Sequence, residues 1–393
     1  MTKDSLRVRS RRRKLSLRAK RLRARVLRLL RSQGFNLGRD LRIKAVGKSK
    51  KKIRKIHEHF RYDRLADEKA FVREWYPKIS KYFASGEEVN PVRVDPYPVL
   101  VEDSAEHAAL FRIASLWWSV PVSKGYGRRF RILIFDRSNG KLFGLLALAD
   151  PVFNLKTRDT WIGWDVHTRE KNLAHVMDAY VLGSVPPYNR LLGAKFASLL
   201  AASDFTRDVF KRRYGGAKSI ISGRKFDGRL ALVTTTTALG RSSVLNRLRF
   251  GDEDVFVPAG FTEGYGHFHL ANGTFSKIRE YMQACGDDEI GKYKFGSGPN
   301  YRIRVVRKAL ERLQLPSNLL RHGVQRGVYV APLAKNTISF LNGRASKLHW
   351  HHRPLEQVVG YWKERWLLPR AERDLSYRDF DSQSWRKIVG ISN

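Results

Sequence analysis

Positive charge is concentrated at the start of this chain and limits what that part can fold into. The first 55 residues contain 23 Lys and Arg against two acids, Asp4 and Asp40, and so hold net +21 of the +39 carried by all 393 residues. A run such as Arg-Arg-Arg-Lys at residues 11–14 repels itself and becomes compact only beside a dense polyanion. We therefore expect a nucleic acid as the partner of this basic arm.

The rest of the chain is also basic. Residues 56–393 contain 53 Lys and Arg and 35 acids, a further net +18, which predicts a basic face or groove on the globular part. Non-specific binding to phosphate backbones is then expected at about 10⁻⁴ to 10⁻⁶ M and falls steeply as salt rises. Composition does not separate DNA from RNA. The cations expected to contact phosphate are Arg11, Arg12, Arg13, Lys14, Arg18, Lys20, Arg21, Arg25, Lys50, Lys51 and Lys52 in the arm, and Arg190, Lys195, Arg241 and Arg247 in a groove of the core.

Composition indicates the class of protein and its surroundings. With 42% hydrophobic residues the chain can bury a sizeable core, and the single cysteine, Cys285, excludes an internal disulfide and a cysteine-based zinc site. No apolar run approaches the roughly 18 to 20 residues that a membrane-spanning helix needs. We expect a cytoplasmic protein without a membrane partner. An Arg-rich, acid-poor start also resembles an organelle transit peptide, but the basic stretch continues past Lys55, farther than a typical leader.

Helical spacing dominates the first 125 residues. Leu15, Leu22 and Leu29 recur every seven residues and predict a helix over residues 14–31 that ends at Gly34. Further helices are expected at residues 53–83 and 105–119. The two regions defined in this way are a basic nucleic-acid-binding arm (1–55) and a helical region (56–125).

The pattern changes to strands after residue 125. Asn139-Gly140 stands between two apolar runs, residues 130–135 and 141–148, and predicts a tight hairpin. Further strands are expected at residues 160–164, 179–184, 230–235 and 266–270, and further helices at 192–200, 203–213, 242–248, 301–313 and 355–366. We therefore expect an α+β fold with a mixed α/β core at 126–275 and a mostly helical C-terminal region at 276–393.

Five strings in the middle and C-terminal parts of the chain resemble one family. They are Thr160-Trp-Ile-Gly-Trp164, Tyr188-Asn-Arg-Leu-Leu-Gly193, Thr234-Thr-Thr-Thr-Ala-Leu-Gly-Arg-Ser-Ser243, Gly264-Tyr-Gly-His-Phe-His269 and Tyr361-Trp-Lys-Glu-Arg-Trp-Leu-Leu-Pro-Arg370. In this order they are similar to the Druantia anti-phage protein A family. The resemblance implies a bacterial or phage-borne protein of a defence system or mobile element, with other components of that system as partners.

The order of elements in the core is also similar to the GCN5-related acetyltransferase fold. That resemblance implies a turn at a helix start where backbone N–H groups hold the pyrophosphate of an acyl carrier. Arg190-Leu-Leu-Gly193 matches the first four positions of the turn, but Lys195 replaces the final small residue, which puts carrier binding in doubt. A lysine there equally suits a nucleic-acid phosphate. An acyl- or group-transferring activity on nucleic acid therefore stays open.

Two histidines offer a candidate site for a divalent metal. On a strand, His267 and His269 would point to the same face. A histidine, a bulky apolar residue and a second histidine is also the metal motif of nickases that attack DNA with a tyrosine. Such a site needs a nucleophile, for which Tyr361 or Tyr281 is the candidate, and a third ligand such as Glu263. Histidines that simply pack beside a turn are the more common case.

Aromatic and histidine residues also stand among cations in the C-terminal part. Trp362 and Trp366 have cations between them and could stack on bases, but their helical spacing puts both on one face, which favours burial. His349, His351 and His352 lie among basic residues, where phosphate contact or simple surface placement is expected rather than a metal site.

Overall fold

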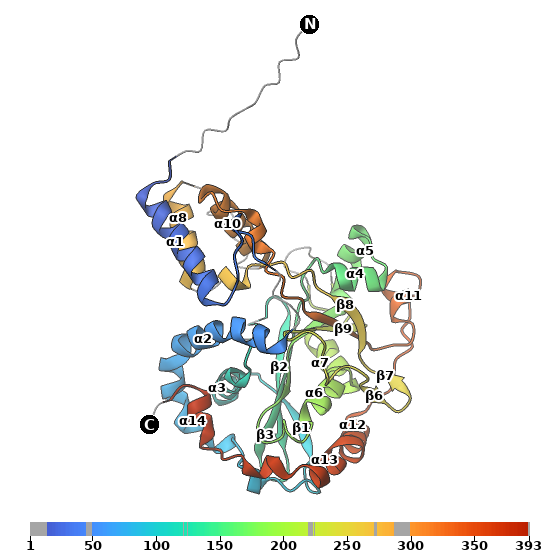
Figure 1. The fold of residues 1–393 in the computed structure, drawn as a ribbon. Coiled ribbons are helices and arrows are strands. Elements are labelled where there is room, and N and C mark those ends of the chain that lie inside the picture. Colours follow the sequence, from blue (N-terminus) through green and yellow to red (C-terminus); the bar gives the residue numbers. More distant parts are fainter. Residues whose placement is uncertain are drawn as a thin grey trace. The chain divides into compact units, whose positions relative to one another are not determined.

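The chain divides into two compact units (Figure 1). The computed structural model describes residues 14–44, 49–120, 122–123, 125–218, 223, 225–270, 273–286 and 299–391. The first unit joins Met1–Val46 to Tyr265–Gly323, and the second joins Gly47–Gly264 to Val324–Asn393. The first unit therefore combines two segments that are distant in sequence, a grouping that the four consecutive regions expected from the sequence do not contain.

Among its described residues, the first unit contains three α-helices. They are α1 (Leu17–Ser32), α8 (Gly273–Ala284) and α10 (Pro299–Arg312). Helix α1 begins after Ser16, whose hydroxyl accepts a hydrogen bond from the backbone N–H of Ala19 at 3.2 Å, and Gly34 follows its end with a φ of 86°. The helix predicted at residues 14–31 is confirmed. Its buried side chains follow the ordinary 3.6-residue period: they are Ala19, Leu22, Val26 and Leu30.

A seven-stranded mixed sheet forms the centre of the second unit (Figure 1). Its strands are β1 (Pro96–Leu100), β2 (Arg129–Asp136), β3 (Lys141–Ala149), β4 (Val176–Ser184), β5 (Leu232–Thr237), β8 (Val257–Phe261) and β9 (Gly327–Pro332). Their order is β1-β2-β3-β4-β5-β9-β8. Neighbours are antiparallel except β4 and β5, which run parallel. The expected α+β class is confirmed.

The turn between β2 and β3 is the predicted hairpin. Gly140 has a φ of 70°, a conformation that glycine adopts without strain. The side-chain oxygen of Asn139 accepts a hydrogen bond from the backbone N–H of Lys141 at 3.0 Å. Asn-Gly therefore fixes the register of the two central strands. A second, short hairpin pairs β6 (Arg249–Phe250) with β7 (Glu253–Asp254).

Alternate residues of the central strands supply two separate cores. Ile132 and Ile134 of β2 belong to one core, and Leu133 and Phe135 to the other, because successive strand side chains point to opposite faces. The first core also contains residues of three helices: α6 (Gly193–Ala201), α7 (Asp204–Tyr214) and α12 (Leu355–Trp362). The second core contains residues of three others: α2 (Lys50–Ile79), α3 (Ala105–Ala114) and α14 (Ser384–Ile388). The remaining helices are α4 (Lys156–Ile162), α5 (Val166–Asn172), α11 (Thr337–Leu341), α13 (Leu368–Arg373) and a π-helical turn, η7 (Lys363–Leu367).

Two of the predicted strands are wrong. Residues 160–164 form the end of α4 and the glycine turn after it, and residues 266–270 form a turn and a 3₁₀-helix, η5 (Phe268–Leu270). The aromatic and β-branched side chains of residues 160–164 favour a strand locally. The helix forms instead because the Asp159 carboxylate accepts a hydrogen bond from the backbone N–H of Leu155 at 3.2 Å and fixes the first turn.

The helix predicted at residues 242–248 is also wrong. The segment is a series of turns. The hydroxyl of Ser242 accepts hydrogen bonds from the backbone N–H groups of Val244 and Leu245, both at 3.2 Å, and Arg247 has a φ of 61°, which a continuous helix does not allow. Across the residues that the structure describes, no helix has both the length and the apolar character needed to cross a membrane.

Candidate nucleic-acid interface

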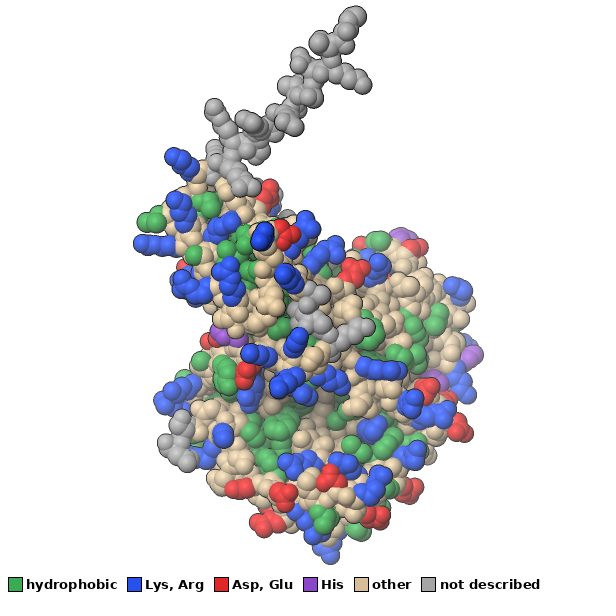
Figure 2. All heavy atoms as spheres, viewed as in Figure 1, with side chains coloured by type: hydrophobic (Ala, Val, Ile, Leu, Met, Phe, Trp, Pro, Cys, Tyr) green, Lys and Arg blue, Asp and Glu red, His purple; other side chains and the backbone are tan. Residues whose placement is uncertain are grey.

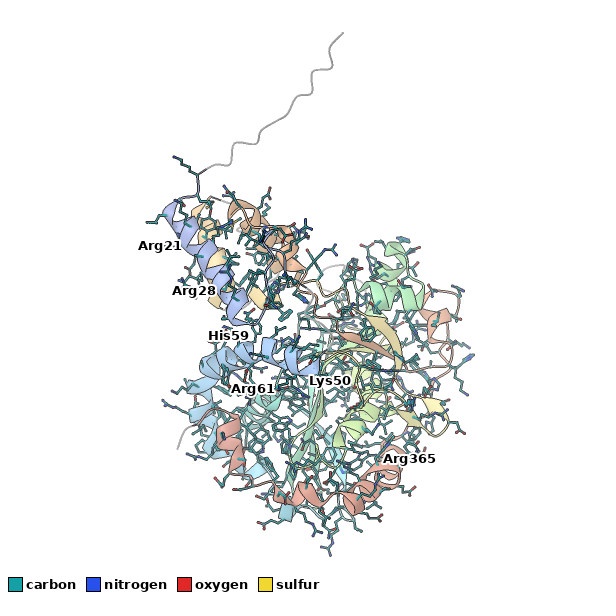
Figure 3. All side chains as sticks on the ribbon, in the orientation of Figure 1. Arg21, Arg28, Lys50, His59, Arg61 and Arg365 are labelled. Atoms are coloured by element: carbon teal, nitrogen blue, oxygen red, sulfur yellow. The ribbon has the colours of Figure 1, made fainter. Side chains whose placement is uncertain are left out.

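One side of α1 carries a row of cations. Arg18, Arg21, Arg25 and Arg28 are all exposed, and their spacing of three and four residues places them along one side of the helix. At about 1.5 Å per residue the row is about 15 Å long. Arg21 and Arg28 are labelled in Figure 3, and Figure 2 shows Lys and Arg side chains along α1. Within the described part of the chain, no acid forms an ion pair with any of the four.

The other cations of the arm divide into anchors and further exposed charges. Arg23 is half-buried, and its guanidinium donates to the backbone carbonyls of Leu313, at 2.7 Å, and Gln314. This bond ties α1 to the segment that follows α10, so Arg23 is a structural residue. Lys14 and Lys20 are exposed. Arg11, Arg12 and Arg13 lie outside the described residues.

The start of α2 carries a second cluster of cations. Lys50, Lys51 and Lys52 occupy the first turn of this 30-residue helix, all three are exposed, and no acid accompanies them there. The N-terminus of a helix has a partial positive charge, so cations at this end destabilise the helix. Ser49, before the first turn, makes no side-chain capping bond. The cluster therefore weakens the free protein, and a bound phosphate would offset that repulsion.

Figure 2 shows a hollow in the second unit, with hydrophobic side chains in it and Lys and Arg side chains around it. Lys50 of α2 and Arg365 of η7 lie on two sides of this hollow in the same view (Figure 3). A low-dielectric floor with a cationic rim strengthens attraction to phosphate.

Lys195 lies next to the turn that carries Arg241 and Arg247. Its ammonium group donates to the backbone carbonyl of Val244 at 3.3 Å and lies 5.0 Å from the ring centre of Trp366. Burial and, second, the nearby Arg365 lower the pKa of Lys195.

The other predicted groove cations have separate surroundings. Arg241 and Arg247 are exposed. Arg190 donates to the carbonyl of Ser376 at 2.6 Å. The structure thus brings Lys195 to the 241–247 turn, while Arg190 is tied to the C-terminal segment.

The first turn of α6 is covered by protein. The indole N–H of Trp362 donates to the carbonyl of Leu192 at 3.2 Å, and Trp362 is fully buried. Gly193 packs so closely that a Cβ there would lie 2.8 Å from side-chain atoms of Phe143 and Ser184. The predicted burial of Trp362 is confirmed. The indole therefore bonds a carbonyl of the turn that the acetyltransferase resemblance assigns to carrier pyrophosphate.

Tyr361 takes part in an aromatic cluster. Its ring centre lies 5.1 Å from that of Phe250 and 5.4 Å from that of Trp366, both edge to face. Tyr361 and Trp366 are half-buried. The candidate nucleophile therefore contributes to packing beside Lys195.

The two histidines of the predicted metal site do not share a strand face. His269 lies in η5, fully buried, with Nε2 2.7 Å from the carbonyl oxygen of Leu319. Burial lowers the pKa of His269 to about 4, and burial together with the nearby Arg302 lowers the pKa of His267 to about 4. A cationic neighbour opposes a bound metal ion. Glu263, the suggested third ligand, instead pairs with Lys156 at 3.2 Å.

No set of three His, Cys, Asp or Glu side chains within the described ranges has the geometry of a metal site. The second histidine cluster pairs with acids: His351 lies 2.8 Å from Glu253, and His352 lies 2.9 Å from Asp204. His349 is exposed. These contacts connect the two acids to the C-terminal segment, and burial lowers the pKa of His351.

Asp178 in β4 was not among the residues predicted from the sequence. Its carboxylate accepts a hydrogen bond from the hydroxyl of Thr234 at 2.8 Å, at the last residue pair between β4 and β5. Burial raises the pKa of Asp178 to about 6, although that hydrogen bond and Arg158 act in the opposite direction. The available signal was an acid inside an apolar run, Val176 to Val181.

Comparison with known proteins gives one consistent family. The family model described as Druantia protein DruA matches residues 47–343. A relative from Escherichia coli (strain UMEA 4076-1), described as Druantia protein DruA, is 40% identical over 365 residues, which cover 93% of this chain and 90% of the relative. No solved structure was found to match the chain.

Proposed function

The chain belongs to the Druantia protein DruA family, and from this membership we propose that it serves Druantia anti-phage defence by binding the phosphate backbone of nucleic acid. The arm and α2 supply most of the affinity, through charge. Base contacts are not required for this role, because backbone contacts alone hold a protein on nucleic acid.

One observation carries the proposal: cations occupy the first turns of α1 and α2, where they weaken the free protein. Two other helices, α3 and α7, instead carry an acid in the first turn, Glu106 and Asp204, which stabilises them. The first turns of α1 and α2 contain no acid. Cations kept at an unfavourable place, exposed and without acid partners, fit a polyanionic ligand.

The salt dependence of binding tests the proposal. The variant replaces Arg18, Arg21, Arg25 and Arg28 by Gln in the full chain, and fluorescence anisotropy measures binding to a labelled duplex and to a labelled single strand. Each lost phosphate contact makes the plot of log K against log salt less steep by about 0.9 for a duplex and about 0.7 for a single strand. Four lost contacts therefore reduce the slope by about 3 to 4 on duplex DNA.

A matched control separates a defined contact from general charge. Replacing the exposed Lys211, Arg212, Arg344 and Lys347 by Gln removes the same formal charge from other surfaces. We expect this control to leave the slope nearly unchanged. Equal losses in the two variants would mean that α1 is not a preferred contact.

We also propose that the sheet of the second unit follows the plan of the GCN5-related acetyltransferases. Two features of the sheet support this plan. Strands β1 to β4 are consecutive antiparallel neighbours. Strands β4 and β5 run parallel and pair over a short stretch, Val176–Asp178 with Leu232–Thr234. The helix after β4 is α6, where that fold holds the acyl carrier. Because Trp362 covers its first turn, we favour binding of nucleic acid over acyl transfer.

A further inference from the structure

A cavity of about 530 Å³ lies in the second unit, at the end of α2 opposite to Lys50. About 26 residues of helix separate Lys50 from Tyr76 in the cavity wall, a distance of about 40 Å. The cavity is therefore separate from the cations at the start of α2. Its volume lies within the range of about 300 to 1,000 Å³ that small-molecule sites occupy.

Aromatic rings form one wall of the cavity. Tyr76 and Phe83 line it, with ring centres 6.2 Å apart and nearly parallel planes. Behind them, the fully buried Trp385 stacks on Phe83 at 3.9 Å. This three-ring stack is rigid, since two of its members are almost completely buried. Because Tyr76 is 6% exposed and Phe83 2%, this wall presents the edges of the rings to the cavity.

Gly86 holds the opposite walls together. A Cβ at this position would lie 2.1 Å from the backbone oxygen of Tyr377, so only glycine allows this approach. Its N–H donates to the carbonyl of Phe380 at 2.7 Å. The hydroxyl of Ser85 then meets that of Ser382 at 3.0 Å. Two segments almost 300 residues apart in sequence are thus joined along the edge of the cavity.

The lining is cationic. It contains Lys81, Lys141 and Arg386 but one acid, Glu88. Glu88 is already engaged, because its carboxylate lies 2.8 Å from the ammonium group of Lys141 and accepts a hydrogen bond from the N–H of Ser85 at 2.6 Å. Lys81 pairs with Glu106, outside the lining, in an exposed ion pair that contributes little and opens readily.

Arg386 is the cation whose charge is not balanced. It is half-buried on α14, and within the described part of the chain no acid lies in ion-pair distance of it and no acceptor bonds its guanidinium. Tyr76 and Arg386 both line the cavity. Burial raises the pKa of the Tyr76 hydroxyl, Arg386 lowers it, and Asp381 raises it. A partly desolvated guanidinium without an acceptor costs free energy that a bound anion would recover.

We propose that this cavity binds a phosphate monoester of the kind that a nucleoside 5′-phosphate carries, with the phosphate on Arg386 and Lys81 and the rest of the ligand beside the ring edges of Tyr76 and Phe83. The hydroxyls of Ser80 and Ser382 and the amide of Gln383, all in the lining, supply neutral hydrogen bonds to the sugar and phosphate. Guanidinium groups bind phosphate in a bidentate manner, which gives the site its orientation. Both a free nucleotide and the 5′ end of a strand present this chemistry.

Isothermal titration calorimetry on the full chain tests the site. The probes are inorganic phosphate, AMP, and a tetranucleotide with either a 5′-phosphate or a 5′-hydroxyl. Arg386→Gln should weaken AMP binding at least tenfold. Lys387→Gln is the matched control, because Lys387 is the next residue of the same helix, is exposed and does not line the cavity. It should bind AMP as the parent does.

The outcomes separate the two sources of the ligand. AMP binding that depends on Arg386 identifies a free nucleotide. Binding of the 5′-phosphorylated tetranucleotide alone, again dependent on Arg386, identifies a strand end. No saturable heat with any probe at millimolar concentration, or equal weakening by Arg386→Gln and Lys387→Gln, would overturn the proposal. A variant of the α1 row should retain this binding, so failure here is distinct from failure of the proposed backbone contact.

Discussion

Replacing Lys50, Lys51 and Lys52 by Gln should stabilise the protein and at the same time weaken its binding to nucleic acid. The three lysines lie in the first turn of α2, exposed, without an acid and without a side-chain cap from Ser49. Each cation at a helix N-terminus costs about 0.3 to 1 kcal/mol at low salt, so the triple variant gains about 1 to 3 kcal/mol. We expect the melting temperature to rise by a few degrees at low salt, with a smaller rise at high salt.

The control variant removes cations from the C-terminal end of a helix instead of the N-terminal end. Lys211 and Arg212 are exposed in the last turn of α7, where cations favour the helix dipole. Replacing both by Gln should lower the melting temperature slightly and leave nucleic-acid binding nearly unchanged. Differential scanning calorimetry and anisotropy on the same samples give both readouts. If the triple Lys variant melts lower than the parent at low salt, the argument from the helix dipole fails.

Two further predictions concern buried side chains. Burial lowers the pKa of His269 to about 4, below its ordinary value of 6.5. Between these two values the unfolded chain binds more protons than the folded chain. The folded first unit therefore loses stability as the pH falls from 6.5 towards 4. A pKa shift of this size corresponds to roughly 3 kcal/mol of unfolding free energy. His269→Gln should make the stability of the first unit depend less on pH, as measured by hydrogen exchange of the α1 and α8 amides. An unchanged dependence on pH would mean that His269 is not the group that titrates. Trp362→Ala should lower the free energy of unfolding by about 3 to 5 kcal/mol, because the indole packs against Phe143 and Phe196. The control Trp366→Ala, at a half-buried residue, should lower it much less. Equal losses of unfolding free energy would mean that Trp362 does not anchor the core.

Features that depend on neighbouring residues could be predicted from the sequence. The apolar spacing of α1 and the Asn139-Gly140 turn each depend on residues that are close in the chain, and both were predicted at the right place. The prediction was wrong where a distant contact or a side-chain bond decides the backbone. Asp159 and Ser242 redirect their neighbours through hydrogen bonds that no periodicity reveals.

The candidate site shows the same division. Exposed cations of α1 and α2 were found from charge alone, since a dense cationic run with one apolar stripe must keep its charges in water. The cavity around Arg386 was not found, because its lining comes from residues 76–88, 141 and 382–386. Each of these segments has an ordinary composition by itself.

The amount of positive charge, its concentration at the start of the chain and the helical period that exposes it can all be read from the order of the amino acids, because they are properties of neighbouring residues. Long-range packing sets the rest: residues 265–323 join α1 in one unit, Trp362 bonds the carbonyl of Leu192 before α6, and Gly86 brings Ser382 to Ser85. The reason is that burial and close approach depend on the sum of many distant contacts, and no short stretch of sequence contains that sum.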